Sequence, residues 1–302
     1  MNTPEKRYAV RVTRDVAYGT AKVGVSTTTP KDRTLALDVY EPEGGPAGVA
    51  RPALILAFGG AFHRGNKESD EFDNEGHRNT PMSGYCREFA RRGYVAFSID
   101  YRLVQEDPDP GTTPVIQDRL GIPRSRVDVV RKMLGLPPAT SEMIWAGIEA
   151  ACDDMVMAFR FVESNAARFG VDPARIALGG FSAGARTALN AAYGERVPAA
   201  AVICLSGFMA DEDLGRHVVG GAGLPPAFIV TGENDLDYVA RQFAPMTRHF
   251  GSVGVTHEAW QVPGGTHFYP ATSTCVCSSG ERSTLEEAMA AFVARSLGTP
   301  SA

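Results

Sequence analysis

The stretch that decides the fold reads Arg175-Ile176-Ala177-Leu178-Gly179-Gly180-Phe181-Ser182-Ala183-Gly184-Ala185. A short apolar run predicts a strand, Gly-x-Ser-x-Gly follows directly, and an Ala-rich run to about Tyr193 predicts a helix. A turn this tight strains the backbone of the serine and brings the helix close to the strand, so only glycine fits on either side. The turn therefore exposes the Ser182 hydroxyl as a nucleophile, with N–H groups of the first helical turn aimed at a developing oxyanion.

Length and composition narrow the class of protein. The chain has 302 residues, of which 44% are hydrophobic and 22% charged, so it can bury a sizeable core. A formal net charge of −5 gives no reason to expect a nucleic-acid partner, whose footprint would be a basic stripe. No run approaches the roughly 18 apolar residues of a membrane span. The first residues lack the apolar segment of a secretory signal, so we expect a cytoplasmic protein, unless a signal peptide has been removed.

The cysteines do not suggest a disulfide framework or a metal site. Five cysteines in a long chain form an odd and sparse set. Cys275-x-Cys277 is one residue shorter than the Cys-x-x-Cys spacing of redox or zinc sites, and no second pair accompanies it. We therefore interpret the cysteines as buried or incidental thiols and expect no metal and no cofactor.

Apolar patterning predicts strands and helices that alternate along most of the chain. Alternating side chains at 8–18 and 33–41 predict two antiparallel, half-buried strands. Further strands are predicted at 53–58, 94–99, 175–181, 199–205, 226–231 and 256–262, and helices at 81–93, 144–169, 183–193, 237–250 and 283–297. This alternation predicts an α/β fold with a mainly parallel sheet, helices on both faces and a single domain over 1–302.

One long irregular region interrupts the alternation. Residues 103–143 contain several prolines and one candidate short helix, from Pro123 to Leu134. Insertions of this length in a compact domain are usually functional, so we expect a lid or partial cap. Four apolar residues are candidates for the lining of an acyl pocket beneath the insertion, with ordinary core packing as the simpler interpretation: Met133, Leu134, Met143 and Trp145.

A serine nucleophile needs a base that is oriented by an acid. In a parallel α/β sheet both should follow strands, because ligands gather at the carboxyl ends of the strands. The predicted strand 226–231 is followed by three candidate acids, Glu233, Asp235 and Asp237. We choose Asp235 because it lies three residues past Gly232, at the end of the strand.

The base is predicted from the last strand of the sheet. Strand 256–262 is followed by a Gly-Gly loop that carries His267, so the chain order is Ser…Asp…His. The remaining histidines lie in other loops, near a helix end or inside a strand, where a solvated or core role is the default: His63, His77, His217, His249 and His257.

With these residues in order, the chain resembles the α/β-hydrolase serine esterases, in particular the carboxylesterase and hormone-sensitive-lipase-like group. The resemblance runs from about residue 34 to the C-terminus and is most specific over 154–187. The matching residues there are Asp154-Met155, Phe159-Arg160-Phe161-Val162, Asn165, Phe169-Gly170-Val171-Asp172-Pro173, Arg175-Ile176-Ala177 and Gly180-Phe181-Ser182-Ala183-Gly184. The resemblance implies the α/β-hydrolase fold, with about eight strands and a lid-like insertion.

The resemblance also implies an oxyanion hole. The family's His-Gly-Gly-Gly motif corresponds to Phe58-Gly59-Gly60-Ala61, with Phe58 in place of the histidine and Ala61 in place of the last glycine. The implied donors are the backbone N–H groups of Gly60, Ala61 and Ala183. The hydrogen bond with which the family's histidine braces this loop is lost with Phe58.

Residues beside the hole and the elbow are candidates for substrate contacts. Phe62, Arg64 and Arg186 are the candidates, and Lys67 lies close by. Arginines here would favour a substrate that carries a carboxylate, because the guanidinium pairs with that group through two hydrogen bonds. The alternative is a solvated loop and an arginine on a helix surface.

The sequence therefore predicts a serine carboxylic-ester hydrolase (EC 3.1.1 type) that works through an acyl-enzyme on a small-molecule or oligomeric substrate. Catalysis would rest on Ser182, Asp235 and His267. One alternative keeps the same residues but cleaves an amide or peptide bond, in an anionic oligomer for example. Another is a non-catalytic binding protein on the same scaffold. A homodimer is compatible with the sequence, and neither nucleic acid nor a membrane span is expected.

Overall fold

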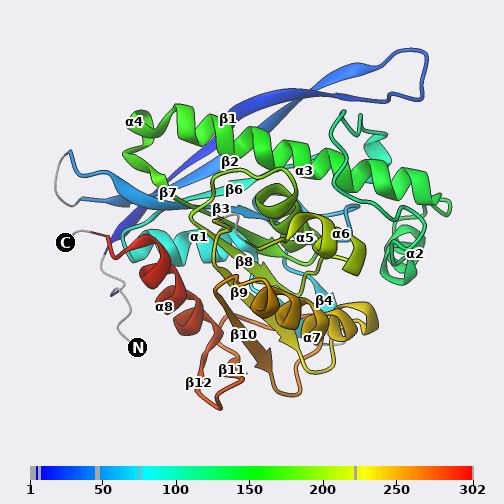
Figure 1. The fold of residues 1–302 in the computed structure, drawn as a ribbon. Helices are drawn as coiled ribbons and strands as arrows, with labels where there is room; N and C mark the ends of the chain where they lie inside the picture. The colour runs from blue at the N-terminus through cyan, green and yellow to red at the C-terminus, as the bar shows by residue number, and fades with distance from the viewer. Residues whose placement is uncertain (1–4, 6–7, 45–47, 75, 221–222, 301–302) are drawn as a thin grey trace.

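The computed structural model describes residues 5, 8–44, 48–74, 76–220 and 223–300, so the N-terminal segment considered for a signal lies almost entirely outside them. A ten-stranded open sheet runs through the described residues in the order β1-β2-β6-β3-β7-β8-β9-β10-β11-β12 (Figure 1). Its strands are β1 (Ala9–Val23), β2 (Lys31–Glu43), β3 (Arg51–Ala57), β6 (Val95–Ile99), β7 (Val171–Phe181), β8 (Ala201–Leu205), β9 (Ala227–Gly232), β10 (His257–Val262), β11 (Thr274–Cys277) and β12 (Arg282–Thr284).

The sheet is parallel in its centre and antiparallel at both edges. Strands β6, β3, β7, β8, β9 and β10 pair in parallel, whereas β1, β2, β11 and β12 pair antiparallel with their neighbours. The central strands β6, β8 and β9 are buried along their whole length, as their unbroken apolar sequences predicted. The fold class and the mainly parallel sheet predicted from the sequence are thereby confirmed. The sheet has two strands more than the expected eight, because β11 and β12 are too short to give a periodic signal.

The helices follow the predicted segments closely. They are α1 (Met82–Arg91), α2 (Ser125–Met133), α3 (Ser141–Ser164), α4 (Ala166–Phe169), α5 (Ala183–Leu189), α6 (Asp211–His217), α7 (Asp237–Ser252) and α8 (Leu285–Leu297), with a 3-10 turn η1 (Val104–Glu106) and a π-helical turn η2 (Asn190–Gly194). Helix α6 and the small hairpin β4 (Asp73–Asn74) and β5 (His77–Arg78) are not among the predicted elements. Threonine side chains cap the N-termini of two predicted helices. Thr140 accepts the N–H of Met143 in α3, and Thr284 accepts that of Glu287 in α8.

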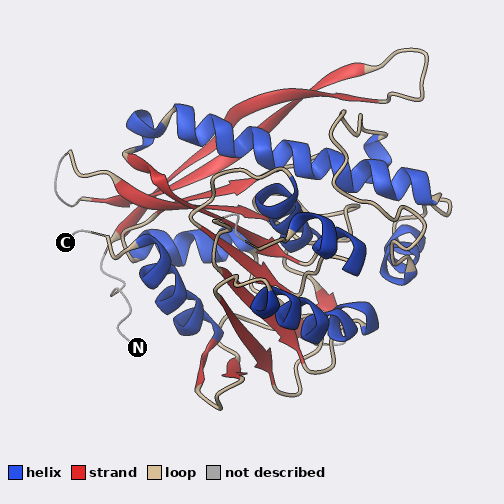
Figure 2. Cartoon of the chain, viewed as in Figure 1, coloured by secondary structure: helices blue, strands red, loops and turns tan. Residues whose placement is uncertain are grey.

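Two groups of helices cover the sheet. Helices α1 and α8 lie side by side, and Arg92 just after α1 pairs with Glu286 and Glu287 of α8. Helices α3, α5, α6 and α7 form the second group, in which each contacts the next directly or through η2. Because the central strands are buried on both faces, the two groups together close the core, while the β1–β2 hairpin projects beyond them (Figure 2).

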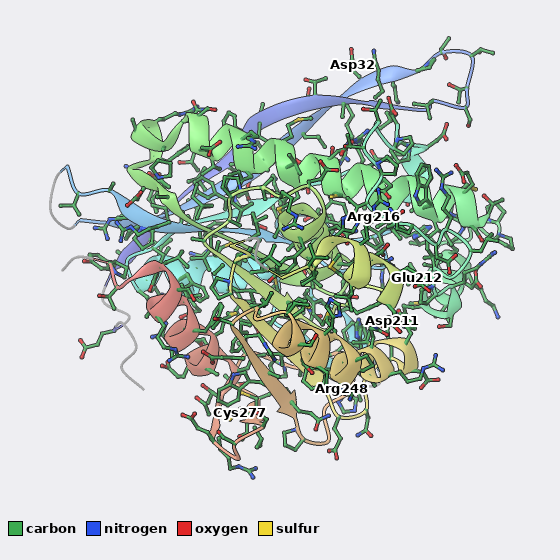
Figure 3. The ribbon with its side chains drawn as sticks, viewed as in Figure 1. Asp32, Asp211, Glu212, Arg216, Arg248 and Cys277 are labelled. Carbon is green, nitrogen blue, oxygen red and sulfur yellow. The ribbon has the colours of Figure 1, made fainter. Side chains whose placement is uncertain are left out.

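Figure 3 shows Asp32, on β2, and Cys277, on β11, on opposite sides of the molecule, and each of these strands lies next to an edge strand of the sheet. All five cysteines are free, and four of them are buried, in agreement with the interpretation from the sequence. Among the described residues, no helix combines the length and the apolar character that crossing a membrane requires.

The insertion at 103–143 is held at several points. Arg102, at its start, forms a buried ion pair with Asp154 of α3, with Nη2 2.9 Å from Oδ1. Farther along, the carboxylate of Glu149 accepts the N–H groups of Val115 and Ile116, at 3.0 and 2.8 Å. Buried carboxylates thus replace the regular hydrogen bonding that this segment lacks. The insertion is a packed part of the molecule and ends where α3 begins.

Candidate active site

The loops that carry the predicted site residues meet at one edge of the sheet. Strands β3, β7, β8, β9 and β10 are neighbours, and they run in parallel (Figure 1). Their carboxyl ends therefore lie together, and the loops that follow them face one another.

Ser182 lies in a strained turn between β7 and α5. Its backbone has φ 53° and ψ −112°, and its N–H donates to the carbonyl of Leu205 at 2.8 Å. A Cβ placed on Gly184 would lie 2.0 Å from the carbonyl oxygen of Ala57, and one on Gly180 would lie 2.4 Å from the carbonyl carbon of Gly184. The two glycines of the motif are therefore required by close packing of the helix on the strand.

Ser182, His267 and Asp235 form a continuous chain of hydrogen bonds. The Oγ of Ser182 lies 2.8 Å from Nε2 of His267, and Nδ1 of His267 lies 2.6 Å from Oδ1 of Asp235. His267 and Asp235 are buried, whereas Ser182 is half-buried and lines two pockets. The histidine can accept the serine proton only as the Nδ1–H tautomer, which the carboxylate on Nδ1 favours.

The carboxylate of Asp235 is held by further donors. Besides His267, it accepts the hydroxyls of Ser206 at 2.5 Å and Thr231 at 3.1 Å, and the N–H groups of Gly232 at 3.1 Å and Leu236 at 2.7 Å. Burial alone would raise the pKa of Asp235. The charge of His267 and the hydrogen bonds from His267, Ser206 and Leu236 outweigh burial and hold the pKa below its usual value.

The competing candidates from the sequence lie elsewhere. Glu233 accepts the N–H of Gly264 through Oε2, and Asp237 is exposed at the start of α7. The other histidines contact backbone carbonyls or are exposed. His63 contacts Ala61, His217 contacts Val115, His249 contacts Val218, His257 contacts Val255, and His77 is exposed on β5.

The loop after β3 approaches Ser182 in an unusual backbone conformation. Gly60 has φ 121°, and Ala61 and Phe62 have φ 56° and 60°. A Cβ on Gly60 would lie 2.0 Å from the carbonyl oxygen of Arg64, so glycine is required there. Ala61 adopts the left-handed conformation, which costs a non-glycine residue about 1–2 kcal/mol. Gly60 and Ala61 line a pocket with Ser182, and Ala183 lines the neighbouring one.

Residues that the sequence analysis did not single out brace this loop. The ring of Phe58 stacks on that of Tyr101, with centroids 4.2 Å apart, and the Tyr101 hydroxyl donates to the Phe58 carbonyl at 2.9 Å. The buried carboxylate of Asp70 accepts the N–H groups of Gly59 and Met82, at 3.2 and 2.8 Å. Burial raises the pKa of Asp70 to about 7 although these hydrogen bonds oppose it. The stacking of Phe58 on Tyr101 and the hydrogen bonds of Tyr101 and Asp70 therefore hold this loop in place without a histidine at position 58.

The insertion is also bonded to this loop. Nδ1 of His63 lies 2.6 Å from the carbonyl oxygen of Ala61, and Nε2 of His63 lies 3.0 Å from Nη1 of Arg131 in α2. Arginine only donates, so Nε2 accepts and Nδ1–H donates to Ala61. The N–H of Val104 also donates to the Phe62 carbonyl, at 2.9 Å. The insertion and the loop are therefore one hydrogen-bonded unit.

Two pockets open from Ser182. The larger has about 490 Å³ of empty volume, counted to its open mouth, and its apolar walls are Ile122, Val127, Ile144, Ile148, Phe208 and Val239. The smaller has about 210 Å³ and is lined by Arg64, Phe72, Arg126, Phe181, His267 and Phe268, together with the loop after β3. Arg126 of α2 and Ala61 border both pockets.

The candidate substrate contacts lie at these pockets, with one exception. Phe62 and Arg186 line the larger pocket, and Arg64 lines the smaller. Arg186 is buried, and its Nη2 lies 3.9 Å from Oδ2 of Asp213. Lys67 borders neither pocket, because it pairs with Asp15 and Asp38, at 2.7 and 3.2 Å.

The apolar residues weighed as pocket lining lie outside both pockets. The exposed fractions of Met133, Leu134 and Met143 are 63, 44 and 38%, and Trp145 is buried next to Arg119. The register of α2 turns Val127 and Arg126 inward instead. Periodicity alone could not choose between these faces, because both carry apolar side chains.

Three carboxylates of the described residues lie close enough together to hold a metal ion. Oxygen atoms of Asp15, Asp38 and Glu68 lie within 4.8 Å of one another. Arg14 and Lys67 pair with these carboxylates, at 2.7 to 3.2 Å, and neutralise them. The cluster is therefore an ion-pair network.

Comparison with known proteins agrees with the fold. A family model described as BD-FAE, a hormone-sensitive-lipase-like α/β-hydrolase domain, matches residues 143–206, from α3 through the elbow to the end of β8. No curated protein sequence matches the chain.

Solved structures of bacterial esterases resemble the whole chain. Esterase 2 of Thermogutta terrifontis, phosphorylated by paraoxon, is 18% identical, with a TM-score of 0.60 over 97% of this chain and 96% of that one. The native esterase of this Planctomycetes species is 19% identical, with a TM-score of 0.55 over 88% and 85%. A bacterial heroin esterase is 19% identical, with a TM-score of 0.56 over 97% and 85%. The chain therefore has the α/β-hydrolase fold.

Proposed function

We propose that the protein is a serine hydrolase (EC 3.1.1 type) that cleaves a carboxylic ester through an acyl-enzyme. The observation that carries this proposal is the series of hydrogen bonds that joins Ser182, His267 and Asp235. Ser182 lines both pockets. The strained elbow and the loop of Gly60 and Ala61 support it, because they are backbone features that a binding protein does not need.

Each half-reaction uses the same groups. Ser182 Oγ forms a bond to the ester carbonyl carbon while its proton passes to Nε2 of His267. The N–H groups of Gly60, Ala61 and Ala183 stabilise the oxyanion, and collapse of the intermediate expels the alcohol, which takes the proton from Nε2. Water then repeats the sequence on the acyl-enzyme and releases the acid and free Ser182. Asp235 stabilises the imidazolium that forms twice in the cycle.

In this proposal the two pockets bind different parts of the substrate, the leaving group and the acyl group. The leaving oxygen must lie within reach of His267 Nε2, and His267 lines the smaller pocket. The acyl group therefore enters the larger, apolar pocket, under the insertion that we propose as a partial cap of a single-domain enzyme. Structures of the Thermogutta esterase with propionate and with butyrate bound favour acyl groups of a few carbons.

The proposal is tested with Ser182→Ala and a fluorophosphonate probe. The wild type should hydrolyse an aryl acetate and be labelled covalently at Ser182. The variant should keep the wild-type Tm and lose at least about 10⁴-fold in kcat, because it has no nucleophile. Comparison with the corresponding anilide separates ester from amide cleavage.

Two results would contradict it. Undiminished hydrolysis by the folded variant would exclude Ser182 as the nucleophile. A wild-type protein that neither turns over esters nor reacts with the probe would be a binding protein on this scaffold.

A further inference from the structure

Two arginines in the smaller pocket are held by an aromatic pair. The rings of Phe72 and Phe268 pack edge to face, with centroids 6.2 Å apart. The guanidinium of Arg64 lies over the Phe72 ring at 4.2 Å, and that of Arg126 lies over the Phe268 ring at 5.3 Å. Stacking of this kind fixes the plane of a guanidinium and leaves its N–H groups free to donate.

Neither arginine has a carboxylate partner. Among the ion pairs and side-chain hydrogen bonds of the described residues, none involves Arg64 or Arg126, and the buried Nε of Arg64 has no acceptor. Burial, and then the charge of Arg126, lowers the pKa of Arg64. Two like charges therefore face the same partly buried space, at an electrostatic cost that a bound anion would relieve.

The other charged groups around the pockets are engaged. Asp235 is bonded to His267, and Arg186, which lines the larger pocket, lies 3.9 Å from Asp213. Exposed arginines of the neighbouring helices, Arg216 on α6 and Arg248 on α7, are labelled in Figure 3 and border neither pocket. Unpaired positive charge is thus concentrated beside His267.

We propose that Arg126 and Arg64 bind a carboxylate on the leaving alcohol of the ester substrate. This inference rests on the hydrolase function proposed above and specifies its substrate class. The placement follows from His267, which must protonate the leaving oxygen and shares the smaller pocket with both arginines. Arg126 comes from the insertion, so the cap supplies half of the anion site and thereby sets the substrate preference.

The test uses two esters that share an acetyl group and a phenolic leaving group, 4-acetoxybenzoate and 4-acetoxybenzamide. We define the anion ratio as kcat/KM for the first divided by kcat/KM for the second. Comparing this ratio between variants cancels the different intrinsic reactivities of the two esters. Arg126→Met should lower the anion ratio about tenfold or more, chiefly by raising KM for the anion. Arg64→Met should also lower it, and Arg126→Lys should fall between wild type and Arg126→Met.

A matched control and an acyl-side arm complete the test. Lys132→Met removes one positive charge from the exposed side of the same helix and should leave the anion ratio within about twofold of wild type. An acyl-side pair, monophenyl succinate and phenyl butyrate, carries the charge in the other pocket. For this pair, Arg126→Met should change the corresponding ratio less than it changes the leaving-group ratio.

The outcomes are distinct. An anion ratio that Arg126→Met and Arg64→Met leave at the wild-type value overturns the proposal, while hydrolysis of the neutral ester keeps the hydrolase function. A loss confined to the succinate ester overturns the placement on the leaving group. If neither ester is hydrolysed and Ser182 is not labelled by the fluorophosphonate, the proposed function fails and this inference fails with it.

Discussion

The carboxylate of Asp235 bonds to His267, and the guanidinium groups of Arg64 and Arg126 share a pocket with His267. These charged groups differ in how they are hydrogen-bonded. Asp235 accepts from two hydroxyls, two backbone N–H groups and the imidazole. The two arginines rest on aromatic rings and have no carboxylate partner among the described residues. The negative charge of Asp235 is stabilised by hydrogen bonds within the protein, whereas the two positive charges have no carboxylate partner among the described residues.

This difference separates two tasks of the site. In the function proposed above, Asp235 orients the catalytic base and must stay in one geometry throughout the cycle, which agrees with the fixed donors around it. A group that binds substrate must exchange partners in every cycle, so its hydrogen bonds cannot all be made within the protein. The number of hydrogen bonds that a charged residue makes within the protein therefore indicates whether it orients another group or binds substrate.

The largest expected effect comes from Asp235→Asn. Three donors, Ser206, Thr231 and Gly232, fix the oxygen of the new amide at the Oδ2 position. Its NH₂ group then faces Nδ1 of His267 and stabilises the Nε2–H tautomer, which cannot accept the serine proton. We expect kcat to fall about 10⁴-fold with little change in KM, measured with an aryl acetate at pH 7 to 8.

Asp237→Asn is the matched control, because Asp237 is the competing carboxylate and is exposed at the start of α7. It should retain wild-type kcat. Equal losses in the two variants would mean that Asp235 does not orient His267.

Ser206→Ala should have an intermediate effect. It removes one donor to Asp235 and leaves the hydroxyl of Tyr269, 2.7 Å from Ser206 Oγ, without that partner. Hydrogen bonds to charged groups are worth about 1.5–3 kcal/mol, so we expect roughly a tenfold loss of kcat/KM or more. The pKa of Asp235 should rise, because a donor to its charged form is lost.

Tyr269→Phe separates the two hydrogen bonds of Ser206. It removes the tyrosine hydroxyl and keeps the bond from Ser206 to Asp235, so its kcat/KM should stay near that of the wild type. A loss of kcat/KM as large as that of Ser206→Ala would assign the effect to the Ser206–Tyr269 pair.

The smallest effect concerns His63, at the contact between the loop after β3 and the insertion. Burial lowers the pKa of His63, the bond to Ala61 raises it, and the charge of Arg131 lowers it, with a net decrease from 6.5. Below pH 6.5 the unfolded chain therefore binds more protons than the folded one. The contribution of His63 to stability is complete above this pH and is lost as the pH falls towards the folded pKa.

We therefore expect the Tm of His63→Leu to fall less between pH 7 and 5 than that of the wild type, although the variant is less stable at pH 7. His77→Leu, which changes an exposed histidine on β5, is the control and should keep the wild-type slope. Parallel slopes for all three proteins would show that His63 does not titrate in this range.

Much of the candidate site around Ser182 could be predicted because its sequence signals are local. The strand-turn-helix pattern around Ser182 identifies the elbow, and the order of the strands then predicts where an acid and a base should follow. Asp235 and His267 meet in space because parallel neighbours β9 and β10 bring their carboxyl ends together. The alternatives Glu233 and Asp237 could be separated from Asp235 only by the path of the loop.

The bracing of the loop after β3 could not be predicted in the same way. Replacement of a histidine by Phe58 is visible in the sequence, but its compensation depends on Tyr101, 43 positions from Phe58, and on Asp70, 11 positions from Gly59. A position two residues past a buried strand, as for Tyr101, was the one available signal.

The sequence by itself determined the parallel sheet, the elbow and the residue types available for catalysis. Each of these follows from side-chain periodicity or from the backbone freedom of glycine, which act over a few residues. Only the tertiary structure decided which face of α2 lines the site, which arginines stay unpaired and what braces Phe58. Those outcomes depend on contacts between segments far apart in the chain, where packing and charge pairing select one arrangement among several that local sequence allows.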